Sequence, residues 1–317
     1  MVTNRILLFG ANGQVGRALQ ALPLPEDWDL RRLTPAECDF TSPSDIGKAF
    51  HDFPPDLAIN AAEMNDLDAC EINPDLAREV NFHAVAHIAG QCDTAGAPLI
   101  QLSTAHVFDG TESTVPYLPD DAMNPINVYG QTKMMGEEAA RHGLYWHVIL
   151  RASLVFSAHG DNILTRTLRQ IDTQDDIQAA QDEIVSPTSA KAVAEALLGI
   201  AKAILNGKGD GFGTFHICSE PEASRFDFLQ AVMQAYAPFT DRRPKLTPVP
   251  ASAIPQHVLR PLYSALNGDK IREVYGIDSR LWHEDLSLAV KEYIETPSKY
   301  GQSNKVRPVC FCPLEKP

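Results

Sequence analysis

The sequence predicts an α/β protein with a Rossmann-type, doubly wound parallel sheet and a smaller α/β domain over the carboxyl edge of that sheet. Three observations lead to this prediction. An apolar run of strand length leads directly into the glycine-rich turn Gly10-x-x-Gly13-x-x-Gly16. Strand and helix patterns then alternate through the first half of the chain, which is typical of βαβ units. Beyond residue 155 the alternation loosens, and proline and short elements become more frequent.

The first predicted strand and helix meet at the glycine turn. Glycines there let the chain turn sharply, approach a pyrophosphate closely and pack a helix on its strand, with the helix N-terminus facing the phosphates. Glycine-rich turns also occur in folds that bind no nucleotide, so the turn by itself indicates a dinucleotide site without establishing it.

The remaining elements of the first half follow from hydrophobic periodicity. Strands are predicted where apolar residues form short runs between turn residues, and helices where they recur every three or four positions. The expected strands are 5–9, 28–33, 56–60, 97–103 and 145–151, and the expected helices are 13–22, 44–53, 66–95 and 127–143. Pro74 is expected to break the helix at 66–95.

The second half divides between two units. A helix at 188–205 and a strand at 213–217 are expected to return to the sheet, so residues 1–155 with 188–218 form the predicted dinucleotide-binding domain. Residues 156–187 and 219–296 form the smaller domain, with helices near 225–236, 269–275 and 284–295. Ligands of doubly wound sheets bind at the carboxyl edge, which this domain would cover. Residues 297–317 show neither helical nor strand periodicity and are interpreted as a surface tail.

Bulk properties exclude several classes of partner. The 317 residues carry a net charge of −14, whereas nucleic acid or an anionic membrane would need a basic patch. The chain has no apolar run of about 18 residues and no signal-peptide pattern, so a cytoplasmic protein is expected. Its six cysteines are scattered and fit reduced thiols, and Cys310 with Cys312 make no complete metal site. We therefore expect no bound metal.

Tyr129 and Lys133 form a Y-x-x-x-K pair. On a helix, residues four apart share a face, so the phenol and the ammonium can lie side by side. A cation about 4 Å from a phenolate contributes roughly 4 kcal/mol at an effective dielectric of 20, or about three pKa units. Such a tyrosine can give a proton to a carbonyl oxygen as a hydride reaches the carbon. The alternative reading is an ordinary surface pair on a helix.

A second hydroxyl is expected near that pair. The predicted strand at 97–103 ends at Ser103-Thr104, at the carboxyl edge of the sheet. A hydroxyl there can bond to the substrate oxygen that Tyr129 protonates, although a Ser-Thr pair at a strand end is often a turn cap. The glycine turn, this strand end and the Y-x-x-x-K pair occur in that order, and a chance combination of all three is improbable.

With these motifs the chain resembles the extended short-chain dehydrogenase/reductase superfamily and, within it, the dTDP-4-dehydrorhamnose reductase family. The stretches that carry the resemblance are residues 6–16, 38–43, 55–62, 103–104, 107–110, 125–133, 186–188 and 260–261. The resemblance implies that Thr104, Tyr129 and Lys133 are catalytic. It also implies that the glycine turn holds NADPH or NADH through Gly10, Asn12, Gly13, Gln14 and Val15.

The resemblance also implies further cofactor contacts. Asp39 and Phe40 would lie at the adenine, Ala61 and Ala62 beneath the nicotinamide-side ribose, and Tyr129 and Lys133 beside the same cofactor. A separate argument does not depend on the resemblance. In NADP-selective sites an arginine near the end of the second strand accommodates the 2′-phosphate, and Arg31 lies near the end of the predicted second strand. The sequence thus favours NADPH and leaves NADH open.

The expected substrate side departs from the family. Ala105-His106 replaces the usual Asp-Tyr, Leu154 replaces a Trp, and Glu63-Met64-Asn65 replaces Ala-His-Thr. Ala105 also argues against a sugar-nucleotide dehydratase, which needs carboxylates at that position. The candidate substrate contacts are His106, Ser153 and Arg260, the last toward a diphosphate.

The function predicted from these residues is NAD(P)H-dependent reduction of a 4-keto sugar nucleotide, with Tyr129 as proton donor. Two alternatives stay open at this point. One is a sugar-nucleotide epimerase that keeps its NAD bound, and the other is a non-catalytic nucleotide-binding subunit like the regulatory subunit of methionine adenosyltransferase. Dimers are common among the proteins that the chain resembles, so a homodimer is a further expectation.

Overall fold

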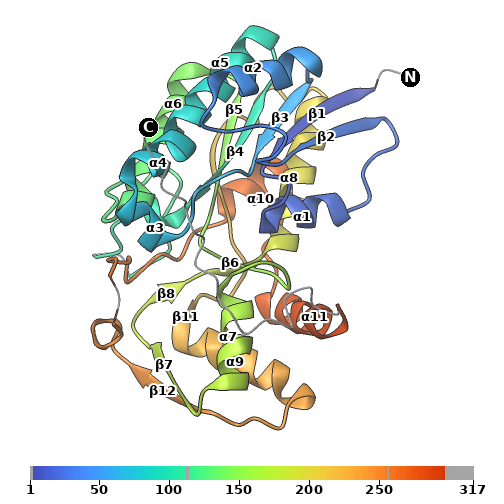
Figure 1. The fold of residues 1–317 in the computed structure, drawn as a ribbon. Coiled ribbons are helices and arrows are strands. Elements are labelled where there is room, and N and C mark those ends of the chain that lie inside the picture. The colour runs from blue at the N-terminus through green and yellow to red at the C-terminus, as the bar shows by residue number, and fades with distance from the viewer. Residues whose placement is uncertain (1–2, 112–113, 256, 297–317) are drawn as a thin grey trace, which may run out of the picture.

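The computed structural model describes residues 3–111, 114–255 and 257–296. It has an upper part, built around one parallel sheet, and a smaller lower part of short strands and helices (Figure 1). The chain crosses between the two parts several times, so each part contains segments from distant regions of the sequence.

Six parallel strands form the central sheet, in the order β10-β5-β4-β3-β1-β2. These strands are β1 (Asn4–Phe9), β2 (Trp28–Leu33), β3 (Leu57–Asn60), β4 (Leu99–Thr104), β5 (His147–Ala152) and β10 (Gly213–Ile217). The central strands are buried on both faces, which is why they read as continuous apolar runs rather than alternating ones. The predicted fold class is confirmed.

Helices cover both faces of this sheet and form a separate core on each. On one face α1 (Gln14–Ala21), α8 (Ala190–Leu205) and α10 (Asp269–Tyr275) pack against the sheet. On the other face lie α2 (Pro43–Asp52), α5 (Ala84–Ala95) and α6 (Val128–Gly143). The predicted helix at 66–95 is interrupted at Pro74, as expected, and divides into α3 (Leu67–Ile72), α4 (Pro74–Arg78), a π-helical turn (Glu79–His83) and α5.

The strand order reverses between β1 and β3, because β2 lies on one side of β1 and the later strands lie on the other. The connections that leave β1 and β3 therefore diverge, and a crevice opens at their carboxyl ends. The glycine turn follows β1, and Ala61 and Ala62 follow β3, so both segments border this crevice.

The lower part is held by a core that includes Phe156, Phe228 and Trp282. Its helices are α7 (Ile163–Thr173), α9 (Arg225–Tyr236) and α11 (Trp282–Glu295). Its strands are the pairs β6 (Leu154–Phe156) with β9 (Pro187–Ser189), β7 (Asp176–Ala180) with β12 (Lys245–Val249), and β8 (Ile184–Val185) with β11 (Ala223–Ser224). The sequence analysis did not predict α7, whose β-branched residues lower its intrinsic helix propensity. A capping box of Asn162 and Thr165 and the packing of its apolar face stabilise it instead.

Three further expectations concern the whole chain. Cys38, Cys70, Cys92 and Cys218 are buried free thiols. No helix in the described ranges is both long enough and apolar enough to cross a membrane. The predictions for the tail at 297–317, including Cys310 and Cys312, lie outside the described residues.

Candidate active site

Two segments far apart in the sequence meet at the carboxyl edge of the sheet. β4 ends at Thr104, and a 3-10 turn (Ala105–Val107) follows. α6 begins directly beside this turn, since a Cβ on Gly130 would come within 2.1 Å of the carbonyl oxygen of His106. The side chain of Asn127 caps α6 by accepting a hydrogen bond from the Gly130 N–H at 2.8 Å. The first turn of α6 is thereby fixed against the end of β4.

The structure brings Thr104, Tyr129 and Lys133 together and adds Glu63 to them. Oε2 of Glu63 accepts a hydrogen bond from the Tyr129 hydroxyl at 3.0 Å and lies 3.0 Å from Nζ of Lys133. Nζ of Lys133 also donates to the carbonyl of Leu102 at 2.8 Å. The side chain of Thr104 lies close enough to the Tyr129 phenol to lower its pKa. A phenol, an ammonium and a hydroxyl thus share one small site.

The pKa of the Tyr129 phenol nevertheless lies well above its ordinary range. Burial is the largest cause and the carboxylate of Glu63 is the second. The sequence analysis expected the ammonium of Lys133 to lower this pKa. That expectation is wrong, because burial and the carboxylate of Glu63 raise the pKa, and the ammonium of Lys133 is paired with that carboxylate.

His106 packs its ring edge against the Tyr129 ring, with the centroids 5.5 Å apart. Its Nδ1 lies 3.2 Å from Nδ2 of Asn127, an amide donor that suits an unprotonated ring nitrogen. Burial lowers the pKa of His106 to about 3, and the charges of Arg225 and Arg260 add to that shift. His106 is therefore neutral near pH 7 and can offer a substrate one N–H donor, at Nε2, rather than the proton of an imidazolium.

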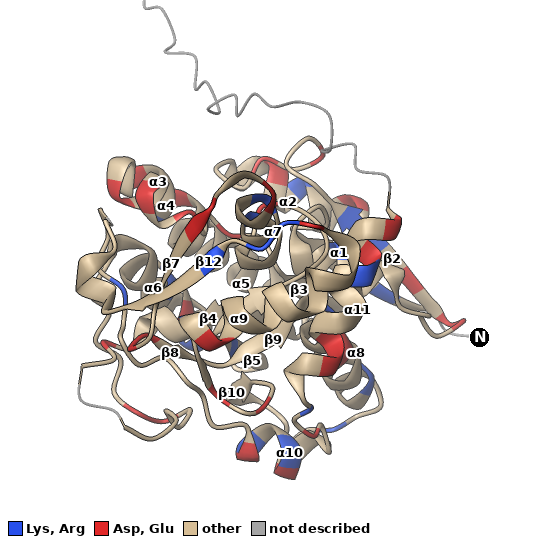
Figure 2. Cartoon of the chain, turned by 90° about the horizontal axis from the view of Figure 1, so that it is seen from below, with Lys and Arg blue, Asp and Glu red and all other residues tan. Residues whose placement is uncertain are grey.

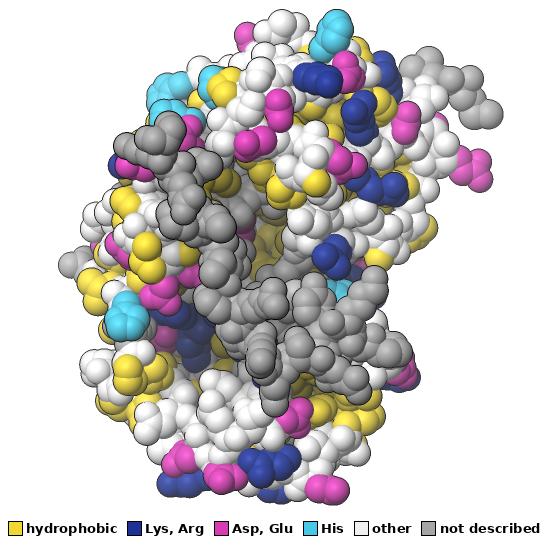
Figure 3. Space-filling model, viewed as in Figure 1, with side chains coloured by type: hydrophobic (Ala, Val, Ile, Leu, Met, Phe, Trp, Pro, Cys, Tyr) yellow, Lys and Arg dark blue, Asp and Glu magenta, His cyan; other side chains and the backbone are white. Residues whose placement is uncertain are grey.

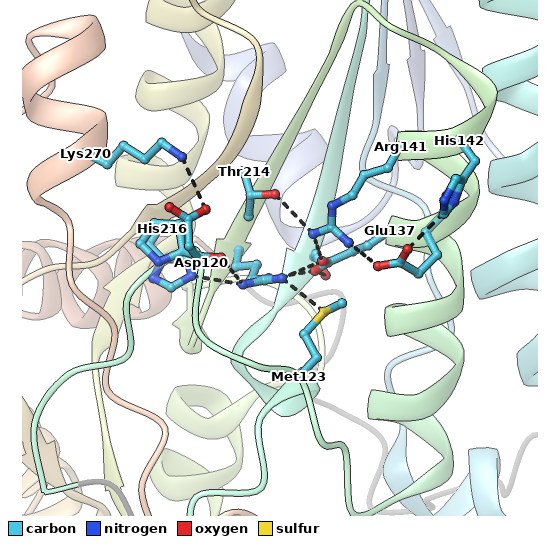
Figure 4. Close-up of polar contacts among 12 residues, drawn as sticks. Asp120, Met123, Glu137, Arg141, His142, Thr214, His216 and Lys270 are labelled. Carbon is cyan, nitrogen blue, oxygen red and sulfur yellow. Dashed lines mark hydrogen bonds and ion pairs between the residues drawn. The ribbon is translucent and has the colours of Figure 1, made fainter.

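A buried polar network ties α6 to the neighbouring strands (Figure 4). The carboxylate of Glu137 accepts two hydrogen bonds from Arg151, at 2.8 and 2.7 Å, and one from Ser103 at 2.5 Å. Burial by itself would raise the pKa of Glu137, but Arg151, Ser103 and Arg141 together outweigh it and lower the pKa. Since Ser103 precedes Thr104 on β4 and Arg151 lies on β5, this network fixes α6 relative to two strand ends.

The turn between β1 and α1 fits the diphosphate of a dinucleotide. Gly10 has a φ of +77°, and a Cβ there would lie 2.5 Å from the backbone of Ala61 and of Ala62, so side-chain atoms are excluded where the two segments meet. Gly13 is the N-cap residue of α1 and provides no side-chain cap. The first backbone N–H groups of α1, which include those of Gln14 and Val15, are thus left for an anion. Asn12 and Gly13 are exposed at this turn.

Asp39 and Phe40 lie on the loop that follows β2. The carboxylate of Asp39 accepts two hydrogen bonds from Thr41, both 2.8 Å long, which lower the pKa of Asp39. The ring of Phe40 packs on Phe9 with the centroids 5.9 Å apart. Because Phe9 is the last residue before the glycine turn, this loop lies next to the proposed cofactor edge.

Arg31, by contrast, is not brought to that edge. It pairs with Leu7 in the middle of β1, and its guanidinium lies 5.9 Å from the ring centroid of Phe53. Arg5, near the start of β1, stacks over the same ring at 4.5 Å. Arg31 thus turns toward the amino edge of the sheet, and its position does not support the expected contact with a 2′-phosphate.

The expected substrate residues lie where the lower part meets the sheet. The hydroxyl of Ser153 lies 3.3 Å from that of Ser264 and accepts a hydrogen bond from the Ser186 N–H at 3.3 Å. Nε of Arg260 is buried without a hydrogen-bond partner among the described residues. Burial lowers the pKa of Arg260, and the neighbouring charge of Arg225 lowers it further. An unpartnered guanidinium nitrogen beside a second arginine suits an anionic ligand.

Charge is distributed unevenly around this region. Figure 2 shows acidic side chains gathered on α3 and α4, where Asp68 and Asp75 lie. The carboxylate of Asp68 is close enough to Arg166 and Arg260 to favour their charged forms. In the space-filling view, basic side chains lie at the level between the upper and lower parts of the molecule (Figure 3). The positive charge expected for binding a diphosphate is therefore local, within an acidic protein.

Sequence reasoning missed three residues that shape the site, although each leaves a signal. Glu63 stands three positions after the end of β3, at the ligand-binding edge, and was noted only as a departure from a family pattern. Glu137 continues the four-residue spacing from Tyr129 and Lys133 along one helix face. Asn127 immediately precedes α6, which is the position of an N-cap.

Comparison with known proteins shows which sequences and solved structures this chain resembles. A dTDP-4-dehydrorhamnose reductase of Sinorhizobium fredii is 34% identical over 281 residues, which cover 88% of this chain and 94% of that protein. The solved structure of a dTDP-4-dehydrorhamnose reductase from Clostridium acetobutylicum aligns with a TM-score of 0.83 at 28% identity, over 91% of this chain and 99% of the other.

A solved dTDP-4-dehydrorhamnose reductase of Bacillus anthracis, in complex with NADP, aligns with a TM-score of 0.82 at 26% identity. The alignment covers 92% of this chain and 99% of the other. The family described as RmlD substrate binding domain matches residues 4–295. Since this match spans nearly all of the sheet, the site and the lower part, the chain belongs to the RmlD substrate binding domain family.

Proposed function

We propose that this protein is an NADPH-dependent reductase of the keto group of a dTDP-4-keto sugar, with dTDP-4-dehydrorhamnose as the first substrate to test. The observation that carries the proposal is the convergence of Thr104, Tyr129 and Lys133 at the carboxyl edge, beside a glycine turn that fits a diphosphate. The names of the similar proteins supply the substrate class.

The proposed chemistry needs a proton as well as a hydride. NADPH supplies the hydride when it is bound. The phenol of Tyr129, which is protonated at neutral pH, gives its proton to the carbonyl oxygen of the sugar as that oxygen gains negative charge. Thr104 and the Nε2–H of His106 lie beside Tyr129 and would donate hydrogen bonds that position the same oxygen.

The cofactor is proposed to lie along the crevice between β1 and β3. The residues that would hold it are Gly10, Asn12, Gly13, Gln14 and Val15 at the diphosphate, Asp39 and Phe40 at the adenine, Ala61 and Ala62 along the chain after β3, and Tyr129 and Lys133 at the nicotinamide end. The similar structure in complex with NADP supports NADPH over NADH. Arg31 is left out of this set because of its position.

The epimerase and the regulatory subunit are less well supported. The reductase of Sinorhizobium fredii, whose sequence covers 88% of this chain, favours a reductase. The three catalytic side chains are all present and close together, which a purely structural subunit would not need. A homodimer and a cytoplasmic location stay predictions, and analytical ultracentrifugation tests the first.

The change Tyr129→Phe tests the proposal directly. We expect it to lower kcat for NADPH-dependent reduction by at least a thousandfold, because the proton donor is lost. Binding of NADPH should change little, since the substitution removes one hydroxyl. Turnover is followed by the loss of NADPH absorbance with dTDP-4-dehydrorhamnose, and binding by calorimetry.

Tyr145→Phe is the matched control. Tyr145 is 83% exposed, so the same loss of a hydroxyl should leave turnover unchanged. Wild-type activity in the Tyr129 variant would contradict the proposed role. Absence of turnover by the wild-type protein with every dTDP-4-keto sugar would contradict the proposed function as a whole.

A further inference from the structure

The carboxylate of Glu63 contacts both Tyr129 and Lys133. Oε2 of Glu63 lies 3.0 Å from both the Tyr129 hydroxyl and Nζ of Lys133. Its other oxygen, Oε1, accepts a hydrogen bond from the side chain of Asn65 at 3.1 Å. Both oxygens of Glu63 therefore have partners. Its Oε2 contacts both Tyr129, the proposed proton donor, and Lys133, a proposed cofactor contact.

The segment that carries Glu63 is held firmly in place. Asn81, which is buried in the π-helical turn before α5, accepts a hydrogen bond from the Met64 N–H at 2.9 Å and donates to the Met64 carbonyl at 3.0 Å. The same side chain donates to the hydroxyl of Thr132 at 3.1 Å. Because Thr132 precedes Lys133 on α6, Asn81 fixes the backbone next to Glu63 directly against the catalytic helix.

The two partners of this ion pair differ in their access to solvent. The side chain of Lys133 is 3% exposed, whereas that of Glu63 is 27% exposed. The bond from Lys133 to the Leu102 carbonyl does not involve Glu63. Glu63 can therefore swing outward, while the ammonium stays in place for another partner.

We propose that Glu63 is a positioning residue that holds Tyr129 and Lys133 before the cofactor binds and then competes with the cofactor for the ammonium of Lys133. Hydroxyl groups of the cofactor that approach Lys133 must displace the carboxylate. This inference rests on the proposed function, because it needs a cofactor at Lys133.

The first test measures the affinity of the purified protein for NADPH by calorimetry, without a substrate. Glu63→Gln keeps the size of the side chain and removes its charge, so we expect the Kd for NADPH to fall about fivefold. Glu63→Ala should lower the Kd at least as much. A substitution that merely damaged the fold would raise the Kd instead, which makes the direction of the change diagnostic.

A matched control removes a charge elsewhere on the same side of the sheet. Asp75 lies on α4, is 94% exposed and pairs with Arg78. Asp75→Asn makes the same change in net charge, and the Kd for NADPH should then match that of the wild type. A fall as large as that of Glu63→Gln would show a general effect of charge and would overturn the proposal.

A double-mutant cycle locates the effect at Lys133. In a Lys133→Met background the carboxylate has no ammonium to hold, so Glu63→Gln should change the Kd less than twofold. If Glu63→Gln lowered the Kd for NADPH as much in the Lys133→Met background as in the wild type, the proposed competition for Lys133 would be overturned.

The outcomes separate this inference from the proposed function. If the wild type binds and oxidises NADPH but Glu63→Gln binds it no more tightly, the inference fails alone. A rise in Kd would mean that Glu63 contacts the cofactor rather than competing with it, which also overturns the inference. If the wild type neither binds nor oxidises NADPH, both fail.

Discussion

Arg260 carries a buried Nε that finds no acceptor within the described residues. Leaving such a group unpaired costs free energy unless a ligand supplies the acceptor. Arg225 lies close by but is already paired with Glu183. At the scale of single residues, Arg260 is therefore the stronger candidate for binding the diphosphate of a sugar nucleotide.

Arg260→Met tests this assignment. We expect the KM for the dTDP-sugar to rise by about tenfold or more with little change in kcat, because a charge-assisted hydrogen bond to a group remote from the reacting carbon is lost. Steady-state kinetics at saturating NADPH measure both constants. Arg272→Met, at an exposed arginine paired with Asp269 on α10, is the control and should leave the KM unchanged. A fall in kcat alone would argue against the assignment.

At the scale of elements, α6 is the part on which the site depends. Its N-cap, its close approach to the turn after β4 and its buried carboxylate together fix Tyr129 and Lys133. Glu137 and Arg151 are both fully buried, so breaking this pair leaves a charge without compensation. A surface pair on the same helix has no such penalty.

Glu137→Gln should lower the free energy of unfolding by about 3 kcal/mol, measured by urea denaturation at pH 7. Glu138→Gln is the adjacent control, since Glu138 also pairs with Arg141 but is partly exposed. Its effect should stay below about 0.5 kcal/mol. Equal effects of the two substitutions would show that the buried network does not hold α6.

The elements also show where sequence reasoning works. The helices α1, α5 and α8 were predicted because apolar residues recur at helical spacing and each covers a large core. The helix α7 was missed because Thr165, Thr167 and Ile171 favour extended chain intrinsically, and tertiary packing overrides that preference. The strands β6, β8, β9 and β11 of the lower part were missed because two or three residues hold no detectable period.

At the scale of the whole molecule, the fold holds one buried histidine, His216, and two half-buried ones, His106 and His147, in the neutral form. Burial lowers the pKa of His216 to about 3, with a further contribution from Arg151, and lowers that of His106 to about 3 and that of His147 as well. Nδ1 of His216 donates to the Tyr117 carbonyl at 3.0 Å, which leaves Nε2 unprotonated toward Arg151. These hydrogen bonds therefore favour the neutral form of His216.

Stability should fall as pH decreases from about 6.5 toward 4.5. In this range the unfolded chain takes up protons on these histidines and the folded chain does not, so acid favours unfolding. Each histidine contributes at most about 1.4 kcal/mol per pH unit. Above about pH 6.5 this contribution to stability is fully present, and below about pH 5 the carboxylates of the unfolded chain add to the loss.

Urea denaturation at several pH values between 4.5 and 7 measures this slope. His216→Asn should reduce the slope, whereas His142→Gln, at an exposed histidine, should not. A stability that stays constant across the range would contradict the buried neutral state.

The sequence by itself determined the sheet, the glycine turn and the identity of Thr104, Tyr129 and Lys133. These features are local, because a strand, a turn or a pair of residues four apart on a helix is written in consecutive positions. The resemblance to a reductase family followed from the same local motifs, and the family match confirms it.

Only the tertiary structure decided how those residues are set against one another. Glu63 lies 66 positions from Tyr129 in the sequence and reaches it through the meeting of β3 and α6. Burial and the carboxylate of Glu63 reversed the expected effect on the Tyr129 pKa, and the guanidinium of Arg31 lies near Phe53 rather than at the expected cofactor edge. Electrostatics in a folded site depends on distance and burial, which neighbouring positions in a sequence do not specify.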